Sequence, residues 1–218
     1  MSFALEQNFK KASKFIDFGD NESAKKIYLD ILKKYPMNIK ASQHLNELNK
    51  NLSKSKTNLR NIVLNDIYEL YKNKKFEDAL NIAFTIYPNN ESNAELNHLI
   101  GLIQLNLGNL DNSISYFKKA VESEPNKMSF NYNLALSLKK LKKFDESFLY
   151  FKKALNLDVN HPNVNFNVAH LYEIKGDIDL SIAHYQKSLR KDKSLYESYI
   201  NLALIFETIG QTENARKI

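Results

Sequence analysis

The side chains that could carry out chemistry are few and scattered. The five histidines are His44, His98, His161, His170 and His184. No two of them are four residues apart on a helix, and no carboxylate recurs beside them, so they form no metal-ligand pattern. The chain has no cysteine, which excludes disulfides, thiolate zinc sites and cysteine nucleophiles, and its five glycines form no phosphate-cradling loop. The sequence therefore predicts a protein that is not an enzyme and has no cofactor or metal.

Asparagine supplies the polar pattern with a regular spacing. Asn133, Asn167 and Asn201 follow one another at intervals of 34 residues. An amide side chain both donates and accepts hydrogen bonds, so a row of amides can grip the backbone of an extended peptide with little regard for its sequence. A second column, Asn97, Asn131 and Asn165, has the same interval. Asparagine-rich composition, or duplication of the unit, therefore explains both columns as well as peptide binding does.

The same interval runs through the apolar and small residues. If units begin at Ala94, Met128, Pro162 and Tyr196, position 8 is always small, position 20 is Ser or Ala, and position 24 is aromatic wherever the chain reaches it. Apolar residues at positions 4, 7, 8 and 11 share one face of a helix, and those at 17, 20, 21, 24, 27 and 28 share one face of a second. The small residues let the two helices approach closely, and Gly at position 15 ends the first.

This pattern resembles the tetratricopeptide repeat (TPR) family, whose 34-residue helix–turn–helix unit has small residues at positions 8 and 20, an aromatic at 24 and Pro near 32. The resemblance implies an all-α fold, a right-handed superhelix of stacked antiparallel helix pairs. An earlier unit, Leu5 to Asn38, also fits, and Arg60 to Asn93 fits loosely. There Pro88 arrives about one turn early, which predicts a short second helix and an earlier start for the next one.

The repeats predict three segments. Residues 1–52 are a TPR unit plus an extra helix from Ile39 to about Leu52, and residues 53–59 are a polar joint that begins with a loop at 53–57. Residues 60–218 are an array with units starting near 60, 94, 128, 162 and 196, the last incomplete. The final first helix is expected at Tyr196–Ile209, and the chain stops inside the helix after it. Either the chain is the front piece of a longer protein, or its open end binds something, such as a second copy.

In the TPR family, positions 2, 6, 9 and 13 of the first helices line a concave groove. The resemblance therefore implies a scaffold that binds a protein or extended peptide there. The asparagine column at position 6 resembles the ladder in the TPR arrays of O-linked N-acetylglucosamine transferases. The candidate groove residues are Asn133, Asn167, Asn201, Ser129, Asn163, Lys140 and His170. The Lys, Asn and Arg clamp of TPR co-chaperones that bind heat-shock protein tails is absent, because position 5 holds only His, Tyr, Phe and Ile.

Two other functions stay open. TPR arrays often precede a glycosyltransferase or sulfotransferase domain, so the chain could be the recognition module of a larger enzyme. Alternatively, the uncapped C-terminal helix pair could mediate self-assembly into a homo-oligomer.

Charge and hydropathy indicate where the protein is located and whether it binds nucleic acid. The net charge is +6, and Lys118, Lys119, Lys152 and Lys153 predict a basic stripe on the outer faces of second helices. Acids interleave with these lysines, which favours a solvated face over a nucleic-acid site. The chain shows no secretion signal and no apolar run near the roughly 20 residues that cross a bilayer. We expect a cytoplasmic protein that does not contact membranes.

Overall fold

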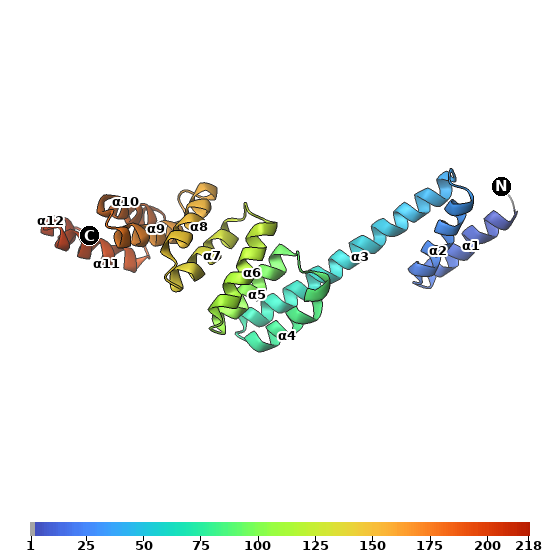
Figure 1. Ribbon diagram of the computed structural model, residues 1–218, viewed down its shortest axis with the longest axis horizontal. Helices are drawn as coiled ribbons and strands as arrows, with labels where there is room; N and C mark the ends of the chain where they lie inside the picture. Colours follow the sequence, from blue (N-terminus) through green and yellow to red (C-terminus); the bar gives the residue numbers. More distant parts are fainter. Residues whose placement is uncertain (1–2) are drawn as a thin grey trace. The chain divides into compact units, whose positions relative to one another are not determined.

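A computed structural model describes residues 3–218, and of residue 56 only the backbone. Every regular element in these residues is helical, which confirms the all-α prediction. The chain divides into two compact units, with the division between residues 65 and 66 (Figure 1). Among the described helices, none combines the length and the apolar character that crossing a bilayer requires.

The first unit contains one antiparallel helix pair and the first part of a long helix. Helix α1 spans Phe3–Asp17 and α2 spans Asn21–Lys34. Gly19 adopts a φ of 78° between them, and the Asp20 side chain caps α2 by accepting from the Ser23 amide at 3.1 Å. The core of this unit joins residues of both helices to two from the next, α3: Leu5, Phe9, Ala12, Ala24, Tyr28, Ile31, Ala41 and Leu48. The repeat predicted from Leu5 therefore packs as a helix pair.

Helix α3 corrects the sequence prediction. It runs without interruption over Ile39–Lys72, so the loop predicted at residues 53–57 is wrong. This segment contains neither Gly nor Pro to end a helix. The hydroxyls of Ser53 and Thr57 donate to the carbonyls of Lys50 and Ser53, at 2.8 and 2.9 Å, and so satisfy polar side chains within the helix. The polar composition of residues 53–57 therefore does not indicate a break in the helix.

The unit predicted from Arg60 is the irregular one. Its second helix, α4, spans only Phe76–Ile86, and the 3₁₀ turn η1 follows at Tyr87–Asn89. The prediction of a short second helix is confirmed. The next helix nevertheless begins at Ala94, in register with the 34-residue interval, because the 3₁₀ turn and residues 90–93 occupy the remaining length. The predicted earlier start is therefore wrong.

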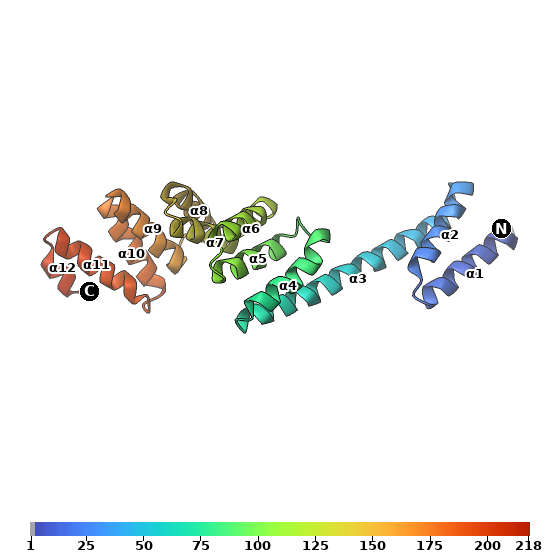
Figure 2. The same cartoon turned by 60° about the horizontal axis from the view of Figure 1, so that its bottom comes forward.

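Regular helix pairs make up the rest of the second unit (Figures 1 and 2). They are α5 (Ala94–Asn106) with α6 (Leu110–Ser123), α7 (Met128–Lys140) with α8 (Phe144–Leu157), α9 (Pro162–Lys175) with α10 (Ile178–Lys191), and α11 (Tyr196–Thr208) with the short α12 (Thr212–Arg216). The second helices α6, α8 and α10 each pack against their own first helix and also against the next one, and α12 packs against α11. This neighbour-to-neighbour packing is that of a TPR-like solenoid. The first helix of the last pair ends one residue before the predicted Ile209.

The small and aromatic columns meet inside each pair. Phe117, Phe151 and Tyr185 at position 24 are fully buried. Gly101 at position 8 lies so close to Phe117 that a Cβ atom there would be 2.6 Å from the ring. One pair further, Ser147 at position 20 donates to the carbonyl of Ala135 at position 8, at 2.8 Å. Small residues are therefore required because the backbones of paired helices nearly touch.

The chain reverses direction at position 15, between the two helices of a pair. Gly176 adopts a φ of 82° there and closes the C-terminus of α9. Lys142 occupies the equivalent position after α7 and adopts a φ of 58°, in the region that L-residues other than Gly, Asn and Asp visit at a cost. The turn geometry is thus kept even where the sequence lacks glycine.

The asparagines at position 4 hold the turns between repeats. Asn131 is fully buried, and its amide nitrogen donates to the carbonyls of Pro125 and Lys127 at 2.8 and 3.0 Å. Asn97 and Asn165 are also fully buried and donate to the two equivalent carbonyls of their own turns. This column therefore has a structural explanation that composition does not supply.

Candidate binding face

The first helices of the array share one solvent-facing surface. On α5, α7, α9 and α11 it comprises positions 2, 5, 6, 9, 12 and 13, and we call it the first-helix face. The seven predicted groove residues all belong to it, but they differ in burial. Asn163 and Lys140 are exposed, and Ser129, Asn133, His170 and Asn201 are half-buried. Asn167 is only 4% exposed.

Asn133 contacts the preceding repeat. Its amide nitrogen lies 2.7 Å from Nε2 of His98 on α5. His98 packs between the rings of Phe117 and Phe130, at centroid distances of 5.6 and 4.5 Å. Burial lowers the pKa of His98 to about 4, so the ring is neutral at pH 7 and its Nε2 accepts from the amide.

Both ends of the Asn167 amide are hydrogen-bonded within the protein. Its nitrogen donates to the carbonyl of Asn163 in the same helix at 2.8 Å. Its Oδ1 accepts from the ammonium group of Lys139 on α7 at 2.6 Å. Little of this amide therefore remains for a peptide unless these bonds are exchanged.

Asn201 also contacts the preceding repeat. Its nitrogen donates to the hydroxyl of the buried Tyr185 at 2.9 Å, and that hydroxyl donates to Oε2 of Glu173 at 3.0 Å. Burial and the nearby Glu173 charge raise the pKa of Tyr185.

The three amides thus link successive repeats, and the partners are His98, Lys139 and Tyr185. The Oδ1 atoms of Asn133 and Asn201 accept no hydrogen bond from the described residues. An amide oxygen has two lone pairs, so these two atoms are the acceptors left for a ligand. The ladder at position 6 remains a prediction, now with two open acceptors.

Charges on the first-helix face are partly compensated. Glu95 pairs with Lys127, the residue just before α7. Lys139 is half-buried, and burial lowers its pKa. On the second helices, Lys118 lies 3.8 Å from Glu146, while Lys152 and Lys153 lie over the rings of Phe148 and Tyr150. The predicted basic stripe is therefore engaged with acids and aromatic rings.

Apolar side chains are exposed at the C-terminal end of the first-helix face. On α11, Ile200 is 58% exposed and Leu204 is 55% exposed. Ile174 on α9 is exposed as well. Such a group of exposed apolar residues next to polar ones is typical of an interaction surface.

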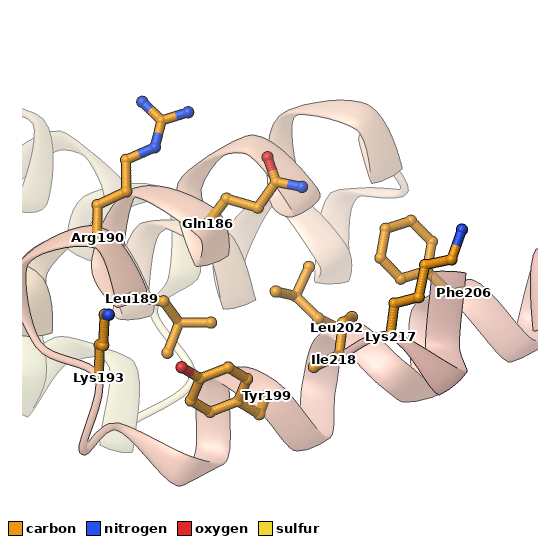
Figure 3. Close-up of a pocket in the computed structure, with 9 residues that line it drawn as sticks. All are labelled: Gln186, Leu189, Arg190, Lys193, Tyr199, Leu202, Phe206, Lys217 and Ile218. Carbon is orange, nitrogen blue, oxygen red and sulfur yellow. The ribbon is translucent and has the colours of Figure 1, made fainter. Parts of the chain in front are cut away.

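A cavity of about 410 Å³ lies between α10, α11 and the last two residues (Figure 3). Its apolar lining comes from Leu189, Tyr199, Leu202, Phe206 and Ile218, and its polar lining from Gln186, Arg190, Lys193 and Lys217. Figure 3 shows Leu189, Tyr199 and Leu202 lying near one another, with Arg190 extending away from them. The lining contains three cations and no acid.

The histidines have packing roles in the described chain. His44 stacks on Tyr28 in the first unit, at 5.6 Å between ring centroids. His161 accepts from the Val164 amide at the start of α9, and His184 lies 2.9 Å from the Asn165 amide oxygen. Residues 3–218 bring together no group of three or more His, Cys, Asp or Glu side chains that could hold a metal ion.

Comparison with known proteins identifies the repeats. The family model described as tetratricopeptide repeat matches residues 94–127, 129–161 and 162–193, which are three of the units set by the 34-residue interval. No curated protein sequence matches the chain.

Solved structures share the fold. A crystal structure of MamA has a TM-score of 0.64 at 17% identity, covering 68% of this chain and 87% of that one. A MamA fragment from Desulfovibrio magneticus RS-1 has a TM-score of 0.65 at 15% identity, over 72% and 89% of the two chains. YrrB, described as a TPR protein with an unusual peptide-binding site, has a TM-score of 0.62 at 18% identity, over 70% and 79%. At these identities the likeness concerns the fold alone.

Proposed function

Because this chain is a tetratricopeptide repeat protein over residues 94–193, we propose that its array is an interaction scaffold whose first-helix face binds a protein partner or an extended peptide. The observation that carries the proposal is the exposed pair Ile200 and Leu204 on α11, beside the open acceptor of Asn201. Apolar contacts and amide acceptors together are what an extended peptide requires.

The expected affinity is modest. Each amide–backbone hydrogen bond contributes roughly 0.5–1.5 kcal/mol. Two open acceptors and two exposed aliphatic side chains therefore favour dissociation constants in the range of about micromolar to millimolar. Such a face suits partners that bind and release quickly, and several different peptides can use it.

Panning of a random peptide library against the full chain tests the proposal. The binding of enriched peptides is then measured on Leu204→Glu and on a matched control, Leu149→Glu. Leu149 lies on the second helix α8 and is 53% exposed, against 55% for Leu204. We expect Leu204→Glu to abolish binding and Leu149→Glu to leave it unchanged. Equal effects of the two substitutions, or no enriched peptide, would remove the proposal.

The amide ladder is tested with the same peptides. Asn133→Ala with Asn201→Ala removes the two open acceptors and is expected to weaken binding without lowering helicity. Unchanged binding would show that apolar contacts carry recognition and that the column is not functional.

A second candidate function is self-assembly through the C-terminal helix pair. In the preceding repeat, His184 of α10 stacks on Tyr172 at position 11, with ring centroids 5.5 Å apart. Phe206 holds position 11 in the last repeat and lines the cavity of Figure 3. The apolar lining of the cavity includes Leu189, Tyr199 and Phe206, and apolar side chains from another copy would fit against it.

Light scattering across a concentration series tests this candidate. Association that disappears in Phe206→Glu, and also in the less buried Tyr199→Glu, would support it. A monomer at every concentration would exclude it.

A further inference from the structure

The cavity of Figure 3 lies on a side of α11 that the first-helix face does not include. Tyr199, Leu202 and Phe206, at positions 4, 7 and 11, line the cavity. Ile200 and Leu204, at positions 5 and 9, belong to the first-helix face. Since 3.6 residues make a turn, the two sets lie at least about 100° apart around the helix axis. The cavity is therefore a separate surface of the array.

The charge around this cavity is positive. Its lining includes Arg190, Lys193 and Lys217, and all three side chains are exposed. The two stretches of chain that carry them, residues 186–193 and 212–218, together contain six basic residues and two acids. The field at the cavity therefore attracts acidic ligands and repels basic ones.

Both of these acids are bonded to other residues. Oδ1 of Asp192 accepts from the backbone N–H and from the hydroxyl of Ser194, at 2.9 and 2.6 Å. Glu213 lies 3.2 Å from Arg216, a cation outside the cavity lining. The cations of the lining take no part in these contacts, so an acidic ligand would meet them directly.

The lining favours a ligand that presents its side chains from a helix. The volume of about 410 Å³ lies near the lower end of the roughly 300–1,000 Å³ of ligand pockets, so the cavity accepts a few side chains and not a whole helix. An extended peptide has backbone N–H groups that need acceptors, whereas Arg and Lys side chains only donate. A helix bonds its own backbone groups and presents apolar side chains at intervals of three or four residues.

The placement of the cations fits such a helix. In the view of Figure 3, Arg190 and Lys193 lie to the left of Leu202, and Lys217 lies to its right. Cations on both sides of an apolar patch are complementary to acids on both sides of an apolar stripe.

We propose that this cavity docks an acidic amphipathic helix of a partner protein. A few aliphatic or aromatic side chains of that helix enter the cavity and contact its apolar lining. Asp or Glu side chains beside them pair with Arg190, Lys193 and Lys217. Because the cavity and the first-helix face are separate, one array can hold a ligand on each.

Selection from a phage library of helical peptides on the full chain tests the proposal. Every member is about 15 residues long, the length at which isolated helices begin to form. Leu is fixed at intervals of three or four residues, and the other positions vary among Glu, Gln, Lys and Ala. We expect selection to enrich Glu beside the leucines. No enriched peptide, or enrichment of Gln or Lys at those positions, would overturn the proposal.

Charge reversal locates the site at which the enriched peptides bind. Fluorescence anisotropy compares a cavity variant, Arg190→Glu with Lys193→Glu and Lys217→Glu, and a control variant, Lys10→Glu with Lys14→Glu and Lys26→Glu. The control changes the net charge equally at exposed lysines of the first unit. Loss of three surface ion pairs predicts at least about tenfold weaker binding in the cavity variant and little change in the control. Equal losses would indicate unspecific attraction and refute the site.

Ile218→Ser tests the apolar part of the site, and Ile209→Ser is its matched control. Ile218 is 40% exposed and lines the cavity, whereas Ile209 is 42% exposed and lies outside the lining. We expect weaker peptide binding in Ile218→Ser and unchanged binding in Ile209→Ser. Unchanged binding in both would contradict the insertion of apolar side chains.

Other ligands and other sites give different results. If binding of the enriched peptides weakens as the chain concentration rises, in step with association seen by light scattering, a second copy fills the cavity and the partner helix is wrong. If Leu204→Glu abolishes their binding and the cavity variant keeps it, they bind the first-helix face and the cavity assignment is wrong. If they bind at the cavity while the random library yields no peptide, the cavity site stands and the proposed function of the first-helix face falls.

Discussion

The amide nitrogen of Asn133 lies 2.7 Å from Nε2 of His98, a residue 35 positions earlier on the first helix of the preceding repeat. The contact requires an unprotonated Nε2, because the amide nitrogen can only donate. It therefore ties the protonation state of one repeat to its packing against the next.

This relationship predicts acid sensitivity. The pKa of His98 is about 4 in the folded chain, against the ordinary 6.5 that we expect after unfolding. Between these values the unfolded chain binds the extra proton, so stability is complete above pH 6.5 and falls as the pH drops toward 4. At about 1.4 kcal/mol per pKa unit, the loss approaches roughly 3 kcal/mol. The pKa values of His170 and His184 are also lowered by burial and act in the same direction.

Urea unfolding at pH 7 and pH 5 measures this effect. His98→Gln keeps an acceptor for Asn133 but cannot be protonated, so the pH dependence of its unfolding should be smaller than that of the natural chain. Identical pH dependence in the two proteins would contradict the assignment to His98.

Asn131→Ala tests the buried asparagines at position 4. The substitution removes the side-chain donor to the carbonyls of Pro125 and Lys127, of which only Lys127 keeps a backbone donor, so we expect the free energy of unfolding to fall by roughly 1–3 kcal/mol. Asn156→Ala, at an exposed position of α8, is the control and should be neutral or slightly stabilising. Thermal unfolding compares the two, and equal melting temperatures would show that the buried contacts contribute nothing.

Gly101→Ala tests the close approach of α5 and α6. The new methyl group would lie 2.6 Å from the buried Phe117 ring. Overpacking typically costs about 1–3 kcal/mol, and the better helix propensity of alanine offsets up to about 1 kcal/mol. We therefore expect a net loss of about 1–2 kcal/mol, seen as faster hydrogen exchange in α5 and α6. Phe117→Leu in the same chain should recover part of the loss, and strictly additive effects would argue against a clash.

Lys142→Gly is expected to stabilise the array. Lys142 holds a φ of 58°, which glycine adopts without steric cost, so the gain should be about 0.5–1 kcal/mol. Lys152→Gly, in the interior of α8, should instead lose about 1 kcal/mol. The urea midpoints of the two variants should move in opposite directions, and a decrease in both would refute the argument from backbone conformation.

The array could be predicted from the sequence because each helix pair repeats the same local packing. Small residues at position 8 and an aromatic at 24 recur because the two positions share a buried core, as Gly101 does with Phe117, Ala135 with Phe151 and Ala169 with Tyr185. The polar residues of α3 were misleading, because Ser53 and Thr57 bond to carbonyls of their own helix and do not interrupt it. A better indicator was present in the lack of Gly and Pro from Ile39 to Lys72.

The site was harder to predict than the fold. The position-6 asparagines were found from their spacing, but their partners His98, Lys139 and Tyr185 occupy three different positions of the unit, so no single column reveals them. The asparagines at position 4 were visible as a column, and their role depends on turn carbonyls that only the folded backbone places within reach. Lys139 was overlooked because its burial and its contact with Asn167 are properties of the packed array.

Hydrogen–deuterium exchange of the full chain, with and without a saturating panned peptide, shows which helices the bound peptide covers. We predict added protection in α5, α7, α9 and α11, strongest around Asn201 and Leu204, with little change in α6 and α8. Protection confined to the second helices α6, α8, α10 and α12 would contradict a binding site on the first-helix face.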